Sequence, residues 1–368
     1  MAFVTPSPAP GRAALHAHGW SKVLSELVAR RELEPEVADT AFADVLEGNV
    51  SAPRLAAFLV ALRAKGESAV ELLAFAAALQ RVSEHVELGA RHERAVDIVG
   101  TGGDRAGTVN VSTLAALVVA GAGGVVCKHG SRAAFSPTGA ADLLEALGVA
   151  ISLSPAGVAR CVEETGFGFC LAARYHPAIA PARAMGRELG VPTVLDVLCP
   201  LANPARVSRQ VVGVANPAGA LPMLEALERS GSRHAMVVYG ADGLDELSTT
   251  SRSQVLESRL APDGTRARRS YEVDPGALGL APAAPAALRG GNPAHNARRA
   301  LAVLSGERGP QRDFVVLNAA AGMIVAGLAD DLAEGMAIAA ATLDRGRAIK
   351  VLEALIEVSQ RAEAEGLV

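Results

Sequence analysis

The chain has 368 residues, of which 50% are hydrophobic but only 3% are aromatic, and its formal net charge is −4. This slightly negative balance, without any run of basic residues, argues against a general nucleic-acid surface and against binding to an anionic membrane. No stretch is long and apolar enough to span a membrane. The length allows about two domains, and a core built mainly from alanine, valine and leucine suits helices packed on a parallel sheet.

The first residues and the cysteines bear on the compartment. Residues 1–18 are rich in proline and alanine and lack a charged segment followed by an apolar run, so we expect a flexible tail and no signal peptide. The cysteines lie without metal-ligand spacing at Cys127, Cys161, Cys170 and Cys199. A chain of this size needs no disulfide bonds, and we expect reduced thiols in a cytoplasmic protein.

Apolar residues recur at helical spacing from residue 19 to residue 90, as at Val23 and Leu27. Ser51 and Ser68 are suitable N-caps for two of the expected helices. This segment predicts a small all-helical domain of about four helices, and the charged residues 91–94 predict a linker after it.

Short apolar runs alternate with helical segments in residues 95–368, which is typical of a parallel sheet with crossover helices. The expected strands are 96–99, 125–128, 169–172, 211–214, 234–239 and 246–248. The expected helices include 113–120, 140–147, 155–165 and 218–229. Residues 261–291 predict loops around a minor β-pair, and the chain from residue 313 onward predicts helices. The fold class is therefore α/β with a mostly parallel central sheet, preceded by the helical domain.

A glycine-rich turn follows the first expected strand, in the sequence Gly100-Thr101-Gly102-Gly103-Asp104. Glycines let the backbone approach a ligand closely, and a helix N-terminus just beyond adds partial positive charge, so the turn suits a phosphate or pyrophosphate. The glycines alone fit a purely structural turn equally well, because neither familiar nucleotide-binding spacing is present. Acceptors and hydroxyls that suit a ribose and a metal-bound pyrophosphate favour the ligand site, at Asp104, Asn110, Ser112 and Thr113.

Three acidic residues, Asp242, Asp245 and Glu246, follow the apolar strand 234–239. The carboxyl end of a strand is where open α/β sheets bind their ligands. Paired carboxylates beside a pyrophosphate suit Mg²⁺, which takes one or two carboxylates together with substrate oxygens and water. Most such pairs are solvated acidic turns, but this density of charge directly after a strand favours a metal site.

The glycine turn opens a longer series of motifs. The others are Lys128-His129-Gly130 with Arg132, Gly139 with Asp142, His176-Pro177-Ala178, Pro200-Leu201 with Asn203-Pro204, Gly240 to Glu246, and Leu317-Asn318-Ala319-Ala320. In this order, from about Ser21 to the C-terminus, the chain resembles the anthranilate phosphoribosyltransferases. Several blocks in one order are far more specific than any single motif.

The resemblance implies attack of an aromatic amine on C1 of 5-phosphoribosyl 1-pyrophosphate, with inversion and loss of pyrophosphate. It also implies a homodimer that pairs through the helical domain, a helical domain completed by residues within 176–190, and an active site in the cleft between the domains. Two Mg²⁺ ions are expected on Asp245 and Glu246, with Ser112 completing one of them. No side chain is assigned as an acid or base.

The resemblance and the residues together give two sets of ligand-binding positions. The donor-binding set is Gly100, Thr101, Gly102, Gly103, Asp104, Thr108, Asn110, Ser112, Thr113, Lys128 and Arg132. The acceptor-binding set is His129, Ser131, His176, Arg183, Cys199 and Pro200.

The acceptor side departs from the family pattern. Ser131 stands where the family has an asparagine, and Cys199 stands where it has a glycine. The arginine that receives the anthranilate carboxylate falls on Gly186. Arg183 lies one helical turn earlier on nearly the same face and is the expected replacement, with Arg187 as the weaker candidate.

Two further departures concern short segments. The usual Arg-Thr-x-Phe-Asn is here residues 192–196, Pro-Thr-Val-Leu-Asp, and a phosphate-contacting serine has become Ala140. The donor side is otherwise largely intact, so we expect the donor to be kept and the acceptor to be less certain.

Alternative functions stay open at this point. The same transfer to another aromatic acceptor in secondary metabolism is one of them. A non-catalytic relative that binds nucleic acid or another polyanion is disfavoured by the negative net charge and the intact acidic pair. Nucleoside phosphorylases, which share the architecture, are disfavoured because the motifs that hold their phosphate are not evident.

Overall fold

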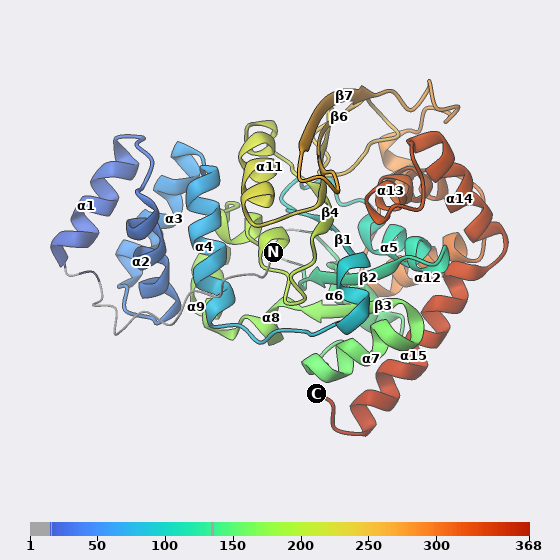
Figure 1. Ribbon diagram of the computed structural model, residues 1–368, viewed down its shortest axis with the longest axis horizontal. Helices are drawn as coiled ribbons and strands as arrows, with labels where there is room; N and C mark the ends of the chain where they lie inside the picture. The colour runs from blue at the N-terminus through green and yellow to red at the C-terminus, as the bar shows by residue number, and fades with distance from the viewer. Residues whose placement is uncertain (1–14, 16, 134–135) are drawn as a thin grey trace.

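The computed structural model describes residue 15, residues 17–133 and residues 136–368. The predicted tail therefore lies almost wholly outside the described residues, and its last two positions belong to the first helix. The described chain forms a helical bundle on one side, a central sheet, and a second layer of helices on the other side (Figure 1). No described helix has the length and apolar character needed to cross a membrane.

The N-terminal region is helical, as predicted. Its four described helices are α1 (Ala17–Val28), α2 (Pro35–Leu46), α3 (Ala52–Lys65) and α4 (Ala69–Arg81). Helix α4 begins with a reciprocal cap, in which the Ser68 hydroxyl accepts from the Glu71 N–H at 3.2 Å and the Glu71 carboxylate accepts from the Ser68 N–H at 3.0 Å. Ser51 precedes α3 without a side-chain capping bond.

The described strands form one seven-stranded sheet in the order β3-β2-β1-β4-β5-β6-β7. The first five are parallel, and β6 and β7 are antiparallel. Their bounds are β1 (Ala95–Gly100), β2 (Val125–Gly130), β3 (Phe167–Leu171), β4 (Arg209–Gly213), β5 (His234–Gly240), β6 (Ser253–Leu260) and β7 (Arg266–Val273). The prediction of a mostly parallel central sheet is confirmed.

The other helices include three short ones and several long ones. They are α5 (Val111–Gly121), α6 (Ala140–Ala146), α7 (Pro155–Thr165), α8 (Ala172–Tyr175), α9 (Ala180–Leu189), α10 (Val194–Val197), α11 (Ala220–Arg229), α12 (Pro293–Leu304), α13 (Pro310–Ala326), α14 (Leu332–Asp344) and α15 (Arg347–Ala364).

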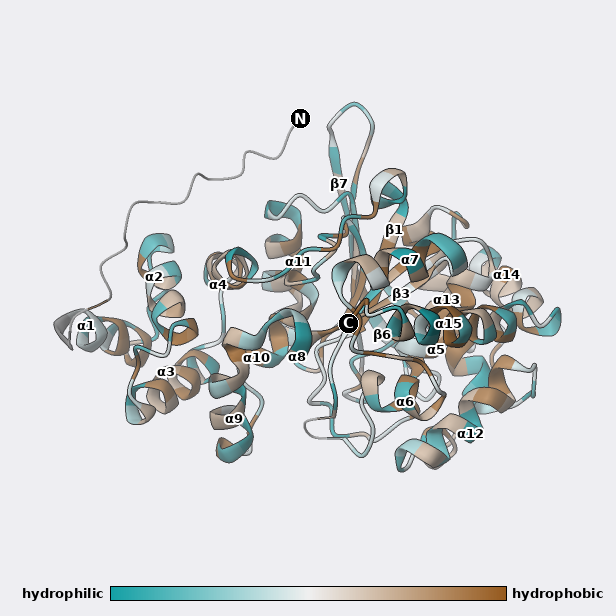
Figure 2. Ribbon diagram, turned by 90° about the horizontal axis from the view of Figure 1, so that it is seen from below, coloured by the Kyte–Doolittle hydropathy of each residue, from teal (hydrophilic) through white to brown (hydrophobic). Residues whose placement is uncertain are grey.

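The sheet separates two hydrophobic cores within the described part of the chain. Successive side chains of a strand point to opposite faces, so Ile98 packs in the core with α5 and α13 while Val99 packs toward the N-terminal helices. Met236 and Val237 divide in the same way on β5. Figure 2 shows the two helical layers on opposite sides of the sheet.

Helices α9, α10 and α11 share the second core with the N-terminal helices. Helices α9 and α10 pack on α3, and α11 packs on α4 and β5. The exact division of the chain into domains stays a prediction.

Two expectations from the sequence were wrong, and one helix was missed. Residues 246–248 form no strand, because the side-chain amide of Asn318 takes the place of a neighbouring strand. Its oxygen accepts from the Leu247 N–H and its nitrogen donates to the Leu247 carbonyl oxygen, at 2.9 Å each. The expected minor β-pair is β6 and β7, of which β6 lies before residue 261, and the two strands extend the main sheet. Helix α12 was not expected.

Candidate active site

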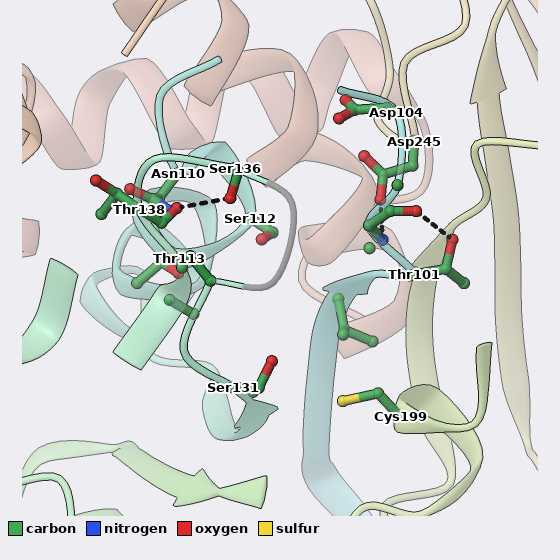
Figure 3. Close-up of a pocket in the computed structure, with 18 of the residues that line it drawn as sticks. Thr101, Asp104, Asn110, Ser112, Thr113, Ser131, Ser136, Thr138, Cys199 and Asp245 are labelled. Carbon is green, nitrogen blue, oxygen red and sulfur yellow. Dashed lines mark hydrogen bonds between the residues drawn. The ribbon is translucent and has the colours of Figure 1, made fainter. Parts of the chain in front are cut away.

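A cavity of about 200 Å³ opens at the carboxyl ends of β1 and β2, beside the start of α5 and helices α9 and α10. The sheet order reverses at β1, which has β2 on one side and β4 on the other. Such a switch point is where open α/β sheets bind ligands. Figure 3 shows Asp104 and Asp245 on one side of this cavity and Asn110, Ser112 and Thr113 on another.

Asp245 lies against two glycines at the ends of paired strands, Gly100 on β1 and Gly213 on β4. A Cβ atom on Gly100 would lie 2.3 Å from the Asp245 carboxylate oxygen Oδ2, and one on Gly213 would lie 1.5 Å from the Asp245 carbonyl oxygen. The N–H of Gly102 donates to Oδ2 at 2.6 Å. Glycine at position 213 therefore leaves room for the backbone of the acidic turn, and glycine at position 100 leaves room for the Asp245 carboxylate.

The carboxylates of Asp245 and Glu246 are buried next to each other, with Asp104 close by. Burial raises the pKa of Asp245, and the neighbouring charge of Asp104 raises it further. Burial and the charge of Asp245 likewise raise the pKa of Glu246. Buried like charges are costly unless a cation joins them, so this arrangement fits a metal site.

The available metal ligands fit Mg²⁺ better than they fit a cation whose ligands all come from the protein. No group of three or more histidine, cysteine or acidic side chains in the described chain is placed to enclose a metal. Mg²⁺ needs only one or two carboxylates and takes its other ligands from substrate phosphates and water. The Ser112 hydroxyl lines the same cavity.

Lys128 lies within β2, before the final residues His129 and Gly130, and its buried side chain lines the cavity. Its Nζ donates to the carbonyl oxygen of Ile98 and lies 3.5 Å from the Ser112 hydroxyl. Burial lowers the pKa of Lys128, while the carboxylates of Asp97 and Glu246 oppose the shift. This position lets the ammonium group meet an anion that lies against Ser112.

A segment far along the chain holds the loop between β1 and α5. Thr108 forms an antiparallel bridge with Arg289, and the N–H of Gly290 donates to the Gly107 carbonyl oxygen at 2.8 Å. The Asn110 side chain donates to the Thr138 carbonyl oxygen and accepts from Asn296, both at 2.9 Å. These contacts fix Asn110 beside Ser112.

Arg132 lines the cavity, but its guanidinium pairs with acidic residues. It lies 2.7 Å from Glu145 and 3.1 Å from Asp142. The Asp142 carboxylate accepts from the N–H groups of Ala133 and Gly139 at 2.8 and 2.9 Å. Arg132 therefore steadies the loop between β2 and α6.

Two histidine rings meet edge to face on the acceptor side, His129 and His176, with centroids 5.0 Å apart. The His129 Nδ1 lies 2.9 Å from the Cys199 carbonyl oxygen, so Nδ1 carries the proton. Burial lowers the pKa of His129 to about 4 and that of His176 to about 2. Both rings are therefore neutral near pH 7.

Most of the predicted ligand-binding residues line the same cavity. The exceptions are His176, which lies behind His129, and Pro200, whose carbonyl oxygen accepts from the Gln210 side chain at 2.6 Å. All eleven predicted donor-binding residues line it, and so do His129, Ser131, Arg183 and Cys199.

Arg183 enters the cavity from α9, whereas the exposed Arg187 is not part of its lining. The Nε of Arg183 is buried and has no hydrogen-bond partner among the described residues. A Cβ atom on Gly186 would meet the Thr193 hydroxyl at 3.5 Å, an ordinary contact, so Gly186 lies against the start of α10.

Sequence reasoning missed other lining residues, among them Arg105, Ser136, Thr138 and Asp196. Asp196 falls at the asparagine of the family's Arg-Thr-x-Phe-Asn segment, and it lies three residues after Thr193, which is the spacing of a helix cap. No local sequence pattern marks Thr138, because its place in the site depends on a contact with Asn110, which belongs to a different motif.

Comparisons with known proteins agree with this geometry. Residues 92–349 match the family model described as the α/β domain of a glycosyl transferase family, and residues 21–83 match the model of its helical bundle domain. The chain is 49% identical to an anthranilate phosphoribosyltransferase of Acidothermus cellulolyticus, over 93% of this chain and 96% of that protein.

Solved structures extend the similarity. The crystal structure of an anthranilate phosphoribosyltransferase from Thermus thermophilus has a TM-score of 0.82 at 42% identity, over 92% of this chain and 99% of that one. The Saccharomyces cerevisiae enzyme in complex with 5-phosphoribosyl 1-pyrophosphate and Mg has a TM-score of 0.83 at 27% identity, over 95% of this chain and 100% of that one.

Proposed function

We infer the reaction from the family to which this chain belongs, the anthranilate phosphoribosyltransferases of the glycosyl transferase family. The chain is an enzyme that moves 5-phosphoribose from 5-phosphoribosyl 1-pyrophosphate to the amine of anthranilate or a related aromatic acid. Pyrophosphate is released, and the reaction is of the tryptophan-biosynthesis type. Mg²⁺ is the cofactor.

On the donor side, the glycine turn and the start of α5 receive the phosphorylated ribose. The backbone of Thr101 to Gly103 and the hydroxyls of Ser112 and Thr113 supply hydrogen bonds, and Lys128 supplies a positive charge. The hydrogen bonds of Asn110 with Thr138 and Asn296 keep these groups in place before the ligand arrives, and this lowers the entropic cost of binding.

Asp245 and Glu246 hold Mg²⁺ with Ser112, and two ions are proposed. The support is the buried acidic pair, whose raised pKa values reflect the cost of leaving it without a cation. When bound, Mg²⁺ neutralises the charge that develops on the leaving pyrophosphate. The protein then needs to hold the two reactants in line rather than to supply a strong nucleophile.

On the acceptor side, Arg183 binds the carboxylate of the aromatic acid, in place of an arginine at position 186. The observation that carries this assignment is the buried Nε of Arg183, which lines the cavity without a partner among the described residues. A guanidinium group in such a position binds a carboxylate through two hydrogen bonds. The neutral ring of His129 lines the cavity and forms part of the wall for the acceptor ring, and the His176 ring packs edge to face against it.

The test is a screen of aromatic amino acids with the donor and Mg²⁺, followed by pyrophosphate release. Anthranilate is expected to react, and chelation of Mg²⁺ is expected to stop the reaction. Turnover of a different aromatic acid without turnover of anthranilate would favour the alternative acceptor. Binding of polyanions without any pyrophosphate release would favour a non-catalytic relative.

We also propose a cytoplasmic homodimer that pairs through the helical domain. The support is the family resemblance and the exposed apolar side chains of Val28 on α1 and Val60 on α3. Light scattering of the purified protein tests the dimer, and a Val28→Glu variant is expected to favour the monomer.

A further inference from the structure

Two side chains of opposite charge line the acceptor end of the cavity without meeting each other. Asp196 on α10 and Arg183 on α9 are both half-buried and both contribute to the lining. They form no ion pair with each other within the described residues, although the charge of Arg183 acts on the Asp196 carboxylate. Opposite charges that share a cavity without contact leave room for a ligand between them.

The Asp196 carboxylate is held by one of its oxygens only. Oδ2 accepts from the Thr193 N–H at 2.8 Å and from the Thr193 hydroxyl at 3.4 Å. In the described chain, no hydrogen bond reaches Oδ1. The cap of α10 therefore fixes the carboxylate while leaving one oxygen for a ligand.

The surroundings of Asp196 make this oxygen a better base than an ordinary surface carboxylate. Burial raises the pKa of Asp196, and this effect exceeds the opposing influence of the Thr193 N–H, Arg183 and Arg63. Glu67, which follows α3, lines an adjoining cavity together with Asp196, and Cys199 lines the main cavity together with Asp196. Burial raises the pKa of Cys199 to about 12, so this thiol carries its proton.

We propose that Asp196 is a catalytic base that takes the proton from the acceptor amine while Arg183 holds the acceptor carboxylate. This inference rests on the proposed function and adds a proton acceptor to it. It defines the acceptor class as an aromatic ring that carries an amine and a carboxylate close enough to reach both side chains.

The step balances as follows in atoms and electrons. The nitrogen lone pair of the amine forms the bond to C1 of the ribose, and the C1–O bond to pyrophosphate breaks, with both its electrons leaving on that oxygen. The nitrogen becomes cationic, and one of its protons passes to Oδ1 of Asp196. The carboxylic acid then returns the proton to water after the product leaves.

His129 is the other nitrogen or oxygen base at this end of the cavity. Its Nε2 is enclosed and has no hydrogen-bond partner among the described residues. Its Nδ1 proton is bound to the Cys199 carbonyl oxygen. Burial lowers the pKa of His129 to about 4, which makes its ring a weaker base, whereas burial raises the pKa of Asp196, so Asp196 is the better candidate for the proton acceptor.

The test is the Asp196→Asn variant, because asparagine keeps the shape and the cap but cannot accept the proton. With enzyme in excess and donor saturating, the single-turnover rate is expected to fall by on the order of 10²-fold, the usual scale of general base catalysis. Donor affinity is expected to stay unchanged. The wild-type rate is expected to fall with decreasing pH as Asp196 protonates, and the variant is expected to lose this dependence.

A Thr193→Ala variant is the matched control, because it weakens the same cap but keeps the carboxylate. If it lowers the rate as much as Asp196→Asn, Asp196 serves only the structure and the inference is overturned. A wild-type rate in Asp196→Asn also overturns it. A wild-type enzyme that transfers to no aromatic amino acid contradicts the proposed function instead.

Discussion

Single glycines decide whether the metal-binding turn fits the sheet. Gly100 and Gly213 face each other across β1 and β4, and both abut Asp245. The clash at Gly213 is with backbone, whereas the clash at Gly100 is with the end of a side chain, which can move. A methyl group at position 100 therefore displaces the carboxylate while leaving the fold intact.

We predict that Gly100→Ala weakens Mg²⁺-dependent binding of the donor by about 10- to 100-fold, the range expected for loss of a charged hydrogen bond. Calorimetry with the donor and Mg²⁺ measures the change. Gly219→Ala is the control, since a Cβ atom there would meet nothing within 4 Å. Equal donor affinity of Gly100→Ala and wild type would show that the carboxylate position is not needed.

On the acceptor side, two arginines of the same helix differ in position, because Arg183 lines the cavity and Arg187 does not. We predict that Arg183→Ala lowers kcat/KM for the aromatic acid by on the order of 10²-fold, with donor affinity little changed. Arg187→Ala provides a matched loss of charge and is expected to have no effect. Steady-state kinetics that show equal losses for both variants would remove Arg183 from the carboxylate site.

Some residues of the candidate site could be predicted from the sequence and others could not, for a physical reason. Positions three apart on a helix differ by only about 60° in direction, so Arg183 could be placed near Gly186 from helix geometry alone. Asp196 and Thr138 could not be placed, because their roles depend on where separate segments meet. Asn296 supports Asn110 from 186 residues away, and no local pattern encodes that contact.

At the scale of elements, the turn between β1 and α5 shows how backbone conformation becomes a binding site. Gly102 and Gly103 have φ values of 71° and 87°, which L-residues with side chains rarely adopt. The Gly102 N–H holds the Asp245 carboxylate in this conformation. The turn thus joins the proposed donor site to the proposed metal site.

We predict that Gly102→Val impairs donor binding in a folded protein. No atom lies within 4 Å of a Cβ atom at this position, so the cost comes from the φ value alone and amounts to roughly 1–3 kcal/mol. Calorimetry on the variant, with circular dichroism to confirm folding, measures the effect. Gly264→Val, also at a positive φ with nothing near its Cβ atom but in the turn between β6 and β7, reports how much of the loss is general backbone strain.

The elements that could be predicted are those whose burial follows a regular pattern. Strands β1, β2, β4 and β5 are buried on both faces and read as short apolar runs. Strand β7 has mostly exposed residues and a basic sequence, so hydrophobicity does not reveal that it pairs with β6. Helix α12 does have an apolar face, made by Ala297, Ala300, Val303 and Leu304, so the sequence carries a helical pattern there as well.

At the scale of the whole molecule, the site lies where two hydrophobic cores meet the end of the sheet. The donor side belongs to the sheet and its helices, and the acceptor side includes α9 and α10, which pack with the N-terminal helices. The acceptor side is therefore set by the packing between these two parts. The two histidines at this boundary connect the stability of the packing to pH.

Burial holds the pKa of His129 and His176 well below the usual 6.5. The unfolded chain then binds more protons than the folded one below about pH 6.5, so the free energy of unfolding decreases as pH falls. For His176, the difference corresponds to about 1.4 kcal/mol for each pH unit below that value, down to a pKa of about 2. This loss of stability concerns the boundary between the two hydrophobic cores, because the His176 ring is hydrogen-bonded at 2.5 Å to Ser83, which follows α4.

We therefore predict that urea unfolding of the wild type shows a marked loss of stability between pH 7 and pH 5, and that His176→Gln shows a smaller loss. Glutamine keeps a polar group for Ser83 but does not titrate. His295→Gln on α12 is the control, because it also removes one histidine but lies away from this boundary. An unchanged pH dependence in His176→Gln would show that the buried rings do not govern the acid sensitivity of the molecule.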